Sequence, residues 1–233
     1  MVKKPPELIV ALDVPTFSEA LSLREKLDGV VSFFKVGKEL FTAVGPEIVR
    51  ALSPARVFMD LKFHDIPKTV AGAVAAAARH GVAIVDVHAS GGSAMMRAAA
   101  LAARESQSPP RVLGVTVLTH LGDEELEELG FGDGSRAQVV RLARLAAQSG
   151  LDGVVASALE VEAIREALGD APLILVPGVR PAWAKESHDQ KRVATPSDAA
   201  RLGASYVVVG RAIALDPSPR AAAERILEEL SLA

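Results

Sequence analysis

The sequence predicts an α/β protein folded as one (β/α)8 barrel, and three observations lead to this prediction. The chain of 233 residues contains eight short runs of β-branched and aliphatic residues. Each run is followed by a segment rich in Ala, Leu, Glu and Arg with helical spacing, so strand and helix alternate eight times. The repeat length of about 29 residues is typical of barrels that reach this size as a single domain. We therefore expect one domain over residues 1–233.

The predicted strands are short and almost continuously apolar. Runs such as Leu173-Ile174-Leu175-Val176 suit a parallel sheet that is covered on both faces better than a sheet with one side in water. In chain order the strands are predicted at 8–14, 30–37, 56–63, 84–89, 111–119, 152–157, 173–179 and 206–212.

The predicted helices follow these strands and carry recognisable start signals. Before the seventh helix, Thr195 can cap, Pro196 fits the first turn and Asp198 suits the positive end of the helix. In chain order the helices are predicted at 18–27, 39–51, 68–80, 92–105, 135–149, 159–168, 196–203 and 219–231.

One connection is unusually long. About 16 residues, 180–195, separate the seventh strand from its helix, whereas such loops usually have about 2–6 residues. In a barrel the loops after the strands build the active face, so this loop is a lid candidate. An open doubly wound sheet is the alternative fold, but it would more often show a glycine-rich turn after its first strand, where this chain has Asp13-Val14-Pro15-Thr16.

Composition excludes several classes of protein. The chain has no cysteine, which removes disulfides, cysteine zinc sites and thiol nucleophiles and fits a reducing compartment. The formal net charge of −3 predicts no general attraction to nucleic acid or to an anionic membrane. No apolar stretch approaches the roughly 18 residues of a membrane helix, and the N-terminus lacks a signal-peptide core. We expect a cytoplasmic protein.

The densest polar cluster, at 60–69, stands where the third strand should end. The two-residue period of a strand places Asp60 and Lys62 on the face that points into the barrel mouth. Lys35 on the second strand and Asp13 on the first reach the same level. The alternative is an Asp–Lys ion pair that plugs the barrel, with Asp65 capping the next helix; however, so many converging charges exceed what a plug needs.

This alternation of charges suits one kind of chemistry. Carboxylates beside cations stay ionised, and ammonium groups beside anions keep their protons. A protonated lysine is a general acid, so the cluster fits a reaction that develops a carbanion and quenches it with a proton. The carboxylates would repel an anionic group that must leave the substrate.

The ends of the seventh and eighth strands predict a phosphate site. Gly178 precedes Val179-Arg180, and Gly210 precedes Arg211. Glycines let backbone amides approach a ligand, arginines supply forked donors, and these two loops are the usual phosphate site of barrels. The alternative is that both arginines are surface residues and both glycines form simple turns.

Other motifs favour structural interpretations. Gly132-x-Gly134-x-x-Ala137 matches a dinucleotide fingerprint but follows an acidic stretch, not a strand, which indicates a loop. Asp86 and His88 are expected to make interior hydrogen bonds, and Trp183 is expected to be a packing anchor within the lid.

These residues together resemble the orotidine 5′-monophosphate decarboxylase family. The resemblance covers nearly the whole chain in family order. It is carried by Ala11-Leu12-Asp13, Asp60-x-Lys62-x-x-Asp65-Ile66-Pro67-x-Thr69, Pro177-Gly178-Val179-Arg180, Asp189-Gln190-Lys191-Arg192-Val193 and Val209-Gly210-Arg211. The D-x-K-x-x-D element is shared with a wider superfamily, whereas Lys35 and the D-Q-K-R-V segment discriminate the substrate.

The resemblance implies catalytic roles. Lys62 would donate the proton to the base carbon that loses carbon dioxide, with Asp60 beside the departing carboxylate and Lys35 completing the charge array. Asp65 and Thr69 would reach into the site of a neighbouring subunit, which implies a homodimer. The reaction converts orotidine 5′-monophosphate to uridine 5′-monophosphate in pyrimidine biosynthesis, without a metal or cofactor.

The resemblance also implies binding roles. Asp13 would hold the ribose, Thr119 on the fifth strand would read the pyrimidine, and Gln190 of the lid would bridge base and phosphate. The phosphate itself would be held by Arg180, the amide of Gly210 and Arg211.

Three other functions fit parts of the pattern. A magnesium-dependent sugar-phosphate decarboxylase or aldolase shares D-x-K-x-x-D but resembles this chain less, since it has an acidic metal ligand where Lys35 stands. A Schiff-base aldolase would need Lys62 or Lys35 as a neutral amine, which the nearby carboxylates oppose. A barrel that only binds a nucleotide phosphate would make no use of the converging charges.

Overall fold

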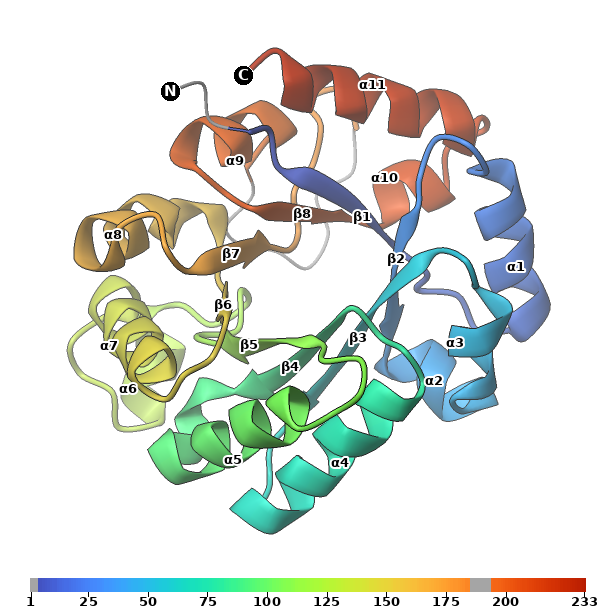
Figure 1. Cartoon of the computed structure of the whole chain (residues 1–233). Helices are drawn as coiled ribbons and strands as arrows, with labels where there is room; N and C mark the ends of the chain where they lie inside the picture. Colours follow the sequence, from blue (N-terminus) through green and yellow to red (C-terminus); the bar gives the residue numbers. More distant parts are fainter. Residues whose placement is uncertain (1–3, 185–193) are drawn as a thin grey trace.

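Eight parallel strands close into a barrel in the computed structural model, which describes residues 4–184 and 194–233 (Figure 1). Each strand pairs with its neighbour in the sequence, and β1 pairs with β8 to complete the ring. The predicted (β/α)8 barrel is thereby confirmed. The strands are β1 (Glu7–Ala11), β2 (Phe33–Gly37), β3 (Arg56–Phe63), β4 (Ile84–His88), β5 (Arg111–Val115), β6 (Gly153–Val155), β7 (Leu173–Val176) and β8 (Tyr206–Val209).

Helices surround the barrel and cover the outer face of its strands (Figure 1). They are α1 (Phe17–Lys26), α2 (Lys38–Val44), α3 (Glu47–Ala51), α4 (Pro67–Arg79), a short 3-10 turn η1 (Ala89–Gly91), α5 (Gly92–Arg104), α6 (Asp123–Glu128), α7 (Ser135–Gln148), α8 (Ala158–Leu168), α9 (Pro196–Leu202), α10 (Arg211–Ala214) and α11 (Pro219–Ser231). None of these helices is long and apolar enough to cross a membrane, among the residues described.

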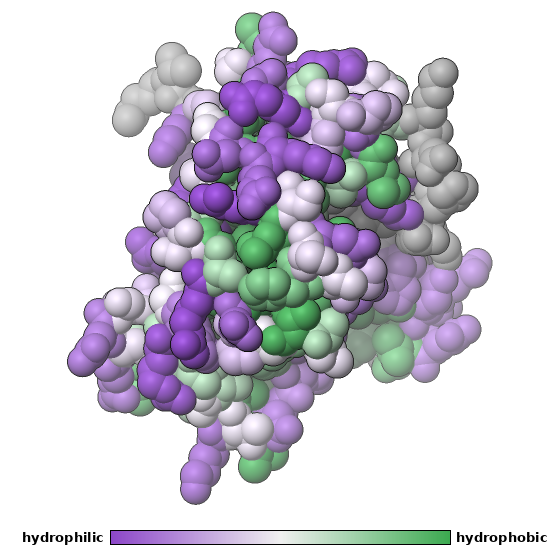
Figure 2. Space-filling view, turned by 90° about the vertical axis from the view of Figure 1, so that its right-hand side faces the viewer, coloured by the Kyte–Doolittle hydropathy of each residue, from purple (hydrophilic) through white to green (hydrophobic). Residues whose placement is uncertain are grey.

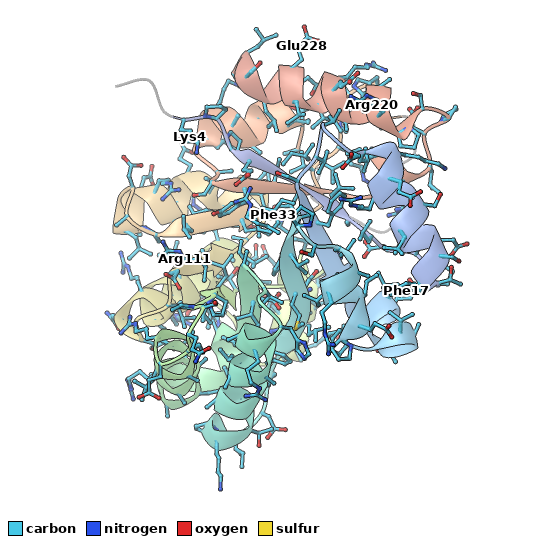
Figure 3. All side chains as sticks on the ribbon, turned by 45° about the vertical axis from the view of Figure 1, so that its right-hand side comes forward. Lys4, Phe17, Phe33, Arg111, Arg220 and Glu228 are labelled. Atoms are coloured by element: carbon cyan, nitrogen blue, oxygen red, sulfur yellow. The ribbon has the colours of Figure 1, made fainter. Side chains whose placement is uncertain are left out.

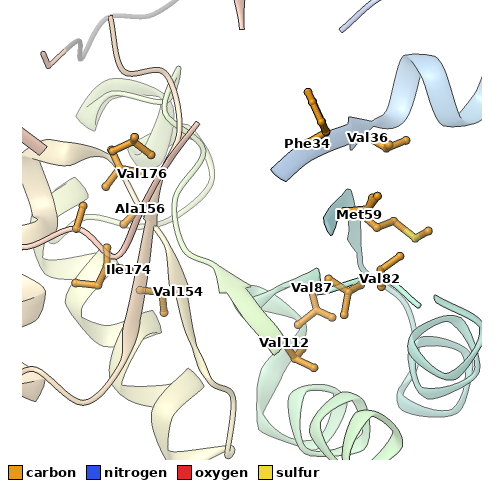
Figure 4. Packing of buried hydrophobic residues seen from close by; sticks show 14 of the residues in the cluster. Phe34, Val36, Met59, Val82, Val87, Val112, Val154, Ala156, Ile174 and Val176 are labelled. Atoms are coloured by element: carbon orange, nitrogen blue, oxygen red, sulfur yellow. The ribbon is translucent and has the colours of Figure 1, made fainter. Parts of the chain in front are cut away.

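The core has two apolar layers, because successive strand residues point to opposite faces. Every strand sends at least one apolar side chain into the barrel, for example Phe33 from β2 and Phe58 from β3. The opposite faces of the strands pack against the helices, as Val36, Met59 and Ile174 show (Figure 4). Burial on both faces explains why the strand sequences are almost continuously apolar.

The outer surface is largely hydrophilic. In Figure 3, charged side chains of α11 such as Arg220 and Glu228 point away from the barrel, whereas Phe33 lies in the middle of the molecule. On the side of the molecule shown in Figure 2, hydrophilic residues surround a smaller central group of apolar residues. The helices thus keep their apolar faces for the barrel and their polar faces for water.

Several strands are shorter than predicted at their carboxyl ends. The predicted strand 111–119 ends at Val115 because its partner β6 offers only Gly153–Val155 for pairing. The predicted strand 173–179 stops before Pro177, which has no N–H to donate. The predicted strand 206–212 stops at Val209, because the chain turns at Gly210 and starts α10.

Two helix predictions are also corrected or refined. The helix predicted at 39–51 is two helices, because Gly45 adopts a left-handed conformation (φ 69°) and Pro46 starts a new turn. The cap predicted at Thr195 is present: its Oγ1 accepts a hydrogen bond from the Asp198 amide at 3.1 Å, and Pro196 occupies the first turn. Residues 185–193 of the predicted lid lie outside the described residues.

Candidate active site

A cavity of about 600 Å³ opens at the carboxyl ends of the strands. Its floor is formed by inward-facing side chains of the barrel such as Ala11, Phe58 and Val155, and its rim by the loops that follow the strands. Four charged residues that the sequence predicts for the site line this cavity together: Asp13, Lys35, Asp60 and Lys62.

These four residues form a continuous chain of opposite charges. The ammonium nitrogen Nζ of Lys35 lies 2.7 Å from Oδ1 of Asp13 and 3.3 Å from Oδ2 of Asp60. The other oxygen of Asp60, Oδ1, pairs with Nζ of Lys62. Lysine and aspartate therefore alternate across the mouth of the barrel, each cation between or beside carboxylates.

The strand order explains why these groups meet. β2 and β3 are adjacent and parallel, with Lys35 opposite Phe58 and Gly37 opposite Asp60. Lys35 and Asp60 both point inward, while Leu61 and Phe63 pack on the apolar layer under the helices. Residues separated by more than 20 positions in the sequence thus converge at one edge of the barrel.

The ionisation of the array follows from these contacts. Burial opposes the charge of Lys35, but Asp60 and Asp13 more than offset it, so its pKa lies above the ordinary value. Burial likewise opposes the charge of Asp60, yet Lys35 and Lys62, with hydrogen bonds from Asp86 and Lys62, hold its pKa below the ordinary value. Both groups remain charged near neutral pH.

Asp86 and His88, both on β4, lie beside this array. Asp86 has no exposed surface, and its Oδ1 accepts a hydrogen bond of 2.8 Å from the backbone N–H of Lys62. The ring of His88 lies 5.1 Å from that of His64 between centroids. Burial, followed by the charges of His64, Lys38 and Lys62, lowers the pKa of His88 to about 4, so its imidazole is neutral at pH 7.

The residues predicted to bind phosphate line the same cavity. Arg180 follows β7, Gly210 follows β8, and Arg211 begins α10. Thr119 also lines the cavity, although it stands in the loop after β5 and not on the strand as predicted. The barrel therefore brings the four charged residues and the residues predicted to bind phosphate and base to one cavity.

Other predicted residues lie elsewhere. Asp65 and Thr69 are exposed and do not line the cavity of their own chain; Oδ1 of Asp65 accepts from the Ile66 amide at 2.6 Å. Gln190 lies outside the described residues. The backbone N–H of Arg180 donates to the carbonyl of Ala194 at 2.9 Å, so the two ends of the predicted lid segment meet.

Trp183 lines the cavity and also anchors the chain. Its Nε1 donates to Oε1 of Glu229 at 3.1 Å, and the guanidinium of Arg225 lies 4.0 Å from its ring centroid. Both partners come from α11, which agrees with the predicted packing role. The fingerprint-like glycines Gly132 and Gly134 lie in the turn between α6 and α7, as expected for a loop.

Sequence reasoning missed two features of the site. A Cβ on Gly37 would lie 2.9 Å from Nζ of Lys35 and 3.1 Å from Oδ1 of Asp13, so the bare glycine backbone leaves room for their ion pair. The hydrogen bond from the Lys62 amide to Asp86 was also not foreseen. The two-residue period of β4 could have placed Asp86 inside the barrel, but not its partner.

In residues 4–184 and 194–233, no three His, Asp or Glu side chains are arranged to hold a metal ion. The carboxylates of Asp13 and Asp60 are paired with lysines instead.

A closed barrel with an array of charges at the carboxyl ends of its strands defines a (β/α)8-barrel enzyme. Comparisons with known proteins narrow this class. Residues 6–226 match the profile of the orotidine 5′-phosphate decarboxylase / HUMPS family. The chain belongs to this family.

Individual relatives are similar in sequence to this chain over nearly their full length. A protein of Moorella thermoacetica named orotidine 5′-phosphate decarboxylase is 50% identical, over 97% of this chain and 92% of the relative. A protein of Trichlorobacter lovleyi with the same name is 48% identical, over 96% of this chain and 95% of the relative. The crystal structure of orotidine 5′-phosphate decarboxylase from Lactobacillus acidophilus superimposes with a TM-score of 0.85 at 38% identity, covering 97% of this chain and 99% of that one.

Proposed function

We propose that this protein is a carboxy-lyase that converts orotidine 5′-monophosphate to uridine 5′-monophosphate in the pyrimidine biosynthesis of the cytoplasm. The names of its relatives support this reaction. The observation that carries the proposal is the alternation of Asp13, Lys35, Asp60 and Lys62 in one cavity. We propose that this array acts without a metal or cofactor.

Asp60 and Lys62 divide the chemical step between them. The carboxylate of the substrate would lie beside Asp60, whose charge is retained, and repulsion between two anions favours loss of carbon dioxide. The bond between the ring carbon and the carboxylate breaks, and its electron pair stays on the ring carbon. The ammonium group of Lys62 gives its proton to that carbon, and the neutral amine regains a proton from water.

Lys35 and Asp13 keep the array in place. Lys35 holds Asp60 from the side opposite Lys62, so the carboxylate cannot turn away from the substrate. Asp13 neutralises Lys35 and has a side chain 52% exposed, which leaves oxygen atoms for a ribose hydroxyl. Preorganised charges of this kind need no rearrangement when the carbanion forms.

The chain segments that follow β5, β7 and β8 would hold the base and the phosphate. We assign the phosphate to Arg180, the Gly210 amide and Arg211, and the pyrimidine to Thr119, since all four line the cavity. Contacts to the remote phosphate contribute binding energy that is used in the transition state. The segment 180–195, with Gln190, would close over the substrate within the single domain.

A second copy of the chain would complete the site. Asp65 and Thr69 are exposed and lie outside the cavity of their own chain, beside Ile66, which is 66% exposed. A dimer interface at this position would bury the apolar side chain of Ile66 within a polar rim. We propose a homodimer in which Asp65 and Thr69 of each chain enter the neighbouring site.

Loss of the orotate absorbance tests the reaction. Purified protein is mixed with orotidine 5′-monophosphate in excess chelator, beside a Lys62→Ala variant with the same circular dichroism. We expect turnover by the wild type and none above background by the variant. A folded, dimeric wild type without activity would contradict the proposal and favour the magnesium-dependent activity. An assay with a sugar phosphate and Mg²⁺, in place of the nucleotide and the chelator, would test that activity.

A further inference from the structure

Lys62 has a backbone conformation that lysine seldom adopts. Its φ is 52°, and it is the one residue other than glycine with positive φ in residues 4–184 and 194–233. A side chain in the left-handed region raises the free energy of the fold, because Cβ crowds the neighbouring carbonyl. Such a conformation persists only where the surrounding structure holds it, and it is often found at functional sites.

The cause lies in a bulge between β3 and β4. Met59 pairs with Val85 and Phe63 pairs with Val87, so three residues of β3 stand opposite the single residue Asp86. In a regular strand, residues two apart lie about 6.8 Å from one another along the chain. The bulge shortens and turns this part of β3, and the ammonium group of Lys62 meets the carboxylate of Asp60.

Asp86 occupies the open position of this bulge. Its side chain is fully buried, and Oδ1 accepts the hydrogen bond from the Lys62 amide at 2.8 Å. The other oxygen, Oδ2, makes no hydrogen bond with a donor of the described residues. Burial of a carboxyl oxygen without a hydrogen-bonding partner is unfavourable. The position of Asp86 therefore calls for a role that accounts for this cost.

We propose that Asp86 is a positioning residue that holds Lys62 in its left-handed conformation and thereby directs the Lys62 ammonium group onto Asp60. Asp86 does not line the cavity and so does not touch the substrate. It acts through the backbone of Lys62. The inference rests on the proposed function, because the alignment of Lys62 matters most when this lysine is the proton donor.

The protonation of Asp86 supports this role. Burial, followed by the charge of Asp60, raises its pKa well above the ordinary value, while Lys62 only partly offsets them. A hydrogen bond between the two carboxyl groups raises the pKa of Asp86 and lowers that of Asp60. A proton retained on Asp86 accounts for both shifts and leaves Asp60 charged. Asp86 thus acts on both members of the pair that it aligns.

Three variants separate positioning from packing. Asp86→Asn keeps an oxygen for the Lys62 amide and adds an N–H donor for Asp60, so we expect its kcat within about threefold of the wild type. Asp86→Leu has the same number of side-chain heavy atoms but is bulkier and has no acceptor. We expect its kcat to fall by about 100-fold with KM within about threefold, since a small misplacement of a reacting group has this effect. Should the leucine variant not fold, Asp86→Ala replaces it.

Thr116→Val is the matched control. Thr116 is also buried in the barrel, and its Oγ1 donates to the Val155 carbonyl at 2.9 Å, but it does not line the cavity. Loss of the Thr116 hydroxyl removes a buried hydrogen bond that does not involve Lys62. We therefore expect Thr116→Val to have the kcat of the wild type. The proposal would be overturned if Asp86→Leu kept a kcat within threefold of the wild type. It would also be overturned if the kcat of Asp86→Asn fell as low as that of Asp86→Leu.

Hydrogen exchange gives a readout that does not depend on activity. In a peptide spanning residues 60–66, we expect the Lys62 amide to exchange at least about tenfold faster in Asp86→Leu and at the wild-type rate in Asp86→Asn. An equal exchange rate of the Lys62 amide in the wild type, Asp86→Leu and Asp86→Asn overturns the inference, whatever reaction the wild type catalyses. A wild type that exchanges as expected but does not decarboxylate its substrate contradicts the proposed function alone.

Discussion

The carboxylate of Asp60 and the ammonium group of Lys35 lie 3.3 Å apart, although β2 and β3 deliver them from separate strands. The side chains are 14% and 11% exposed, so solvent screens their interaction only partly. Because Asp60 also pairs with Lys62, its charge is held from two sides. The ion pair therefore aligns the groups that we assign to the chemical step, and four predictions follow from the site around it.

The first prediction concerns Gly37. A methyl group there would come within 2.9 Å of Lys35 Nζ and 3.1 Å of Asp13 Oδ1. Both atoms end flexible side chains, so we expect Gly37→Ala to displace the ion pair and to change the free energy of unfolding by only about 1 kcal/mol. Its kcat/KM should fall by roughly 10- to 100-fold.

The control for this variant is Gly132→Ala, since nothing lies within 4 Å of a Cβ at Gly132. Steady-state kinetics and urea unfolding of both proteins make the comparison. Wild-type kinetics for Gly37→Ala would show that the Lys35–Asp13 contact is not needed.

The second prediction concerns Arg211, which lines the cavity and begins α10. Hydrogen bonds to a charged group contribute about 1.5–3 kcal/mol. We therefore expect Arg211→Ala to lower kcat/KM by about 10- to 150-fold, although Arg211 touches no reacting atom. Arg136→Ala removes an exposed arginine paired with Glu166 at 3.7 Å and should leave the kinetics unchanged. Equal kinetics for both variants would refute the phosphate assignment.

The third prediction tests the shared site. Lys62→Ala and Asp65→Asn should each be inactive alone, since each removes a group from every site of its homodimer. After the two proteins are mixed and allowed to exchange subunits, random pairing gives hybrids in half of the dimers, and each hybrid has one intact site. Activity should then return to about one quarter of the wild-type value. Mixtures that stay inactive while native mass spectrometry shows hybrid dimers would exclude a shared site.

The fourth prediction concerns pH. The pKa of His88 is about 4 in the folded protein against 6.5 in the unfolded chain. Between these values the unfolded chain binds more protons, so the contribution of His88 to stability is complete above pH 6.5 and is lost as the pH falls toward 4. We expect urea unfolding of His88→Gln to depend less steeply on pH than that of the wild type in this window. Parallel pH profiles would argue against a neutral, partly buried His88.

The alternation of strands and helices could be predicted from local sequence. Apolar runs such as Tyr206-Val207-Val208-Val209 form strands because both of their faces are buried, and this burial is visible in composition alone. The break between α2 and α3 was also present in the sequence, at Gly45 and Pro46, but helical periodicity outweighed it in the prediction. The ends of strands were harder to predict from local sequence, because they depend on the neighbouring strand. For example, β5 stops where β6 has no further residues to pair with.

The charged half of the site could be predicted for a similar reason. Asp13, Lys35, Asp60 and Lys62 stand at or just beyond the ends of strands, and parallel strands in a barrel end at the same edge. Their convergence follows from topology without any knowledge of distances. The placement of Asp65 and Thr69 outside their own cavity depends on the path of the chain into α4, which local patterns do not contain.

Local sequence patterns thus specify the barrel, the order of its elements and the edge at which the charges gather, because these depend on periodicity and on the type of each residue. The folded barrel was needed to see that Asp86 fills a bulge and accepts a hydrogen bond from the Lys62 amide, and that Gly37 leaves room for the Lys35–Asp13 pair. Both features arise from the register between neighbouring strands. Register is set by the packing of the whole barrel, so no single segment of the sequence specifies it.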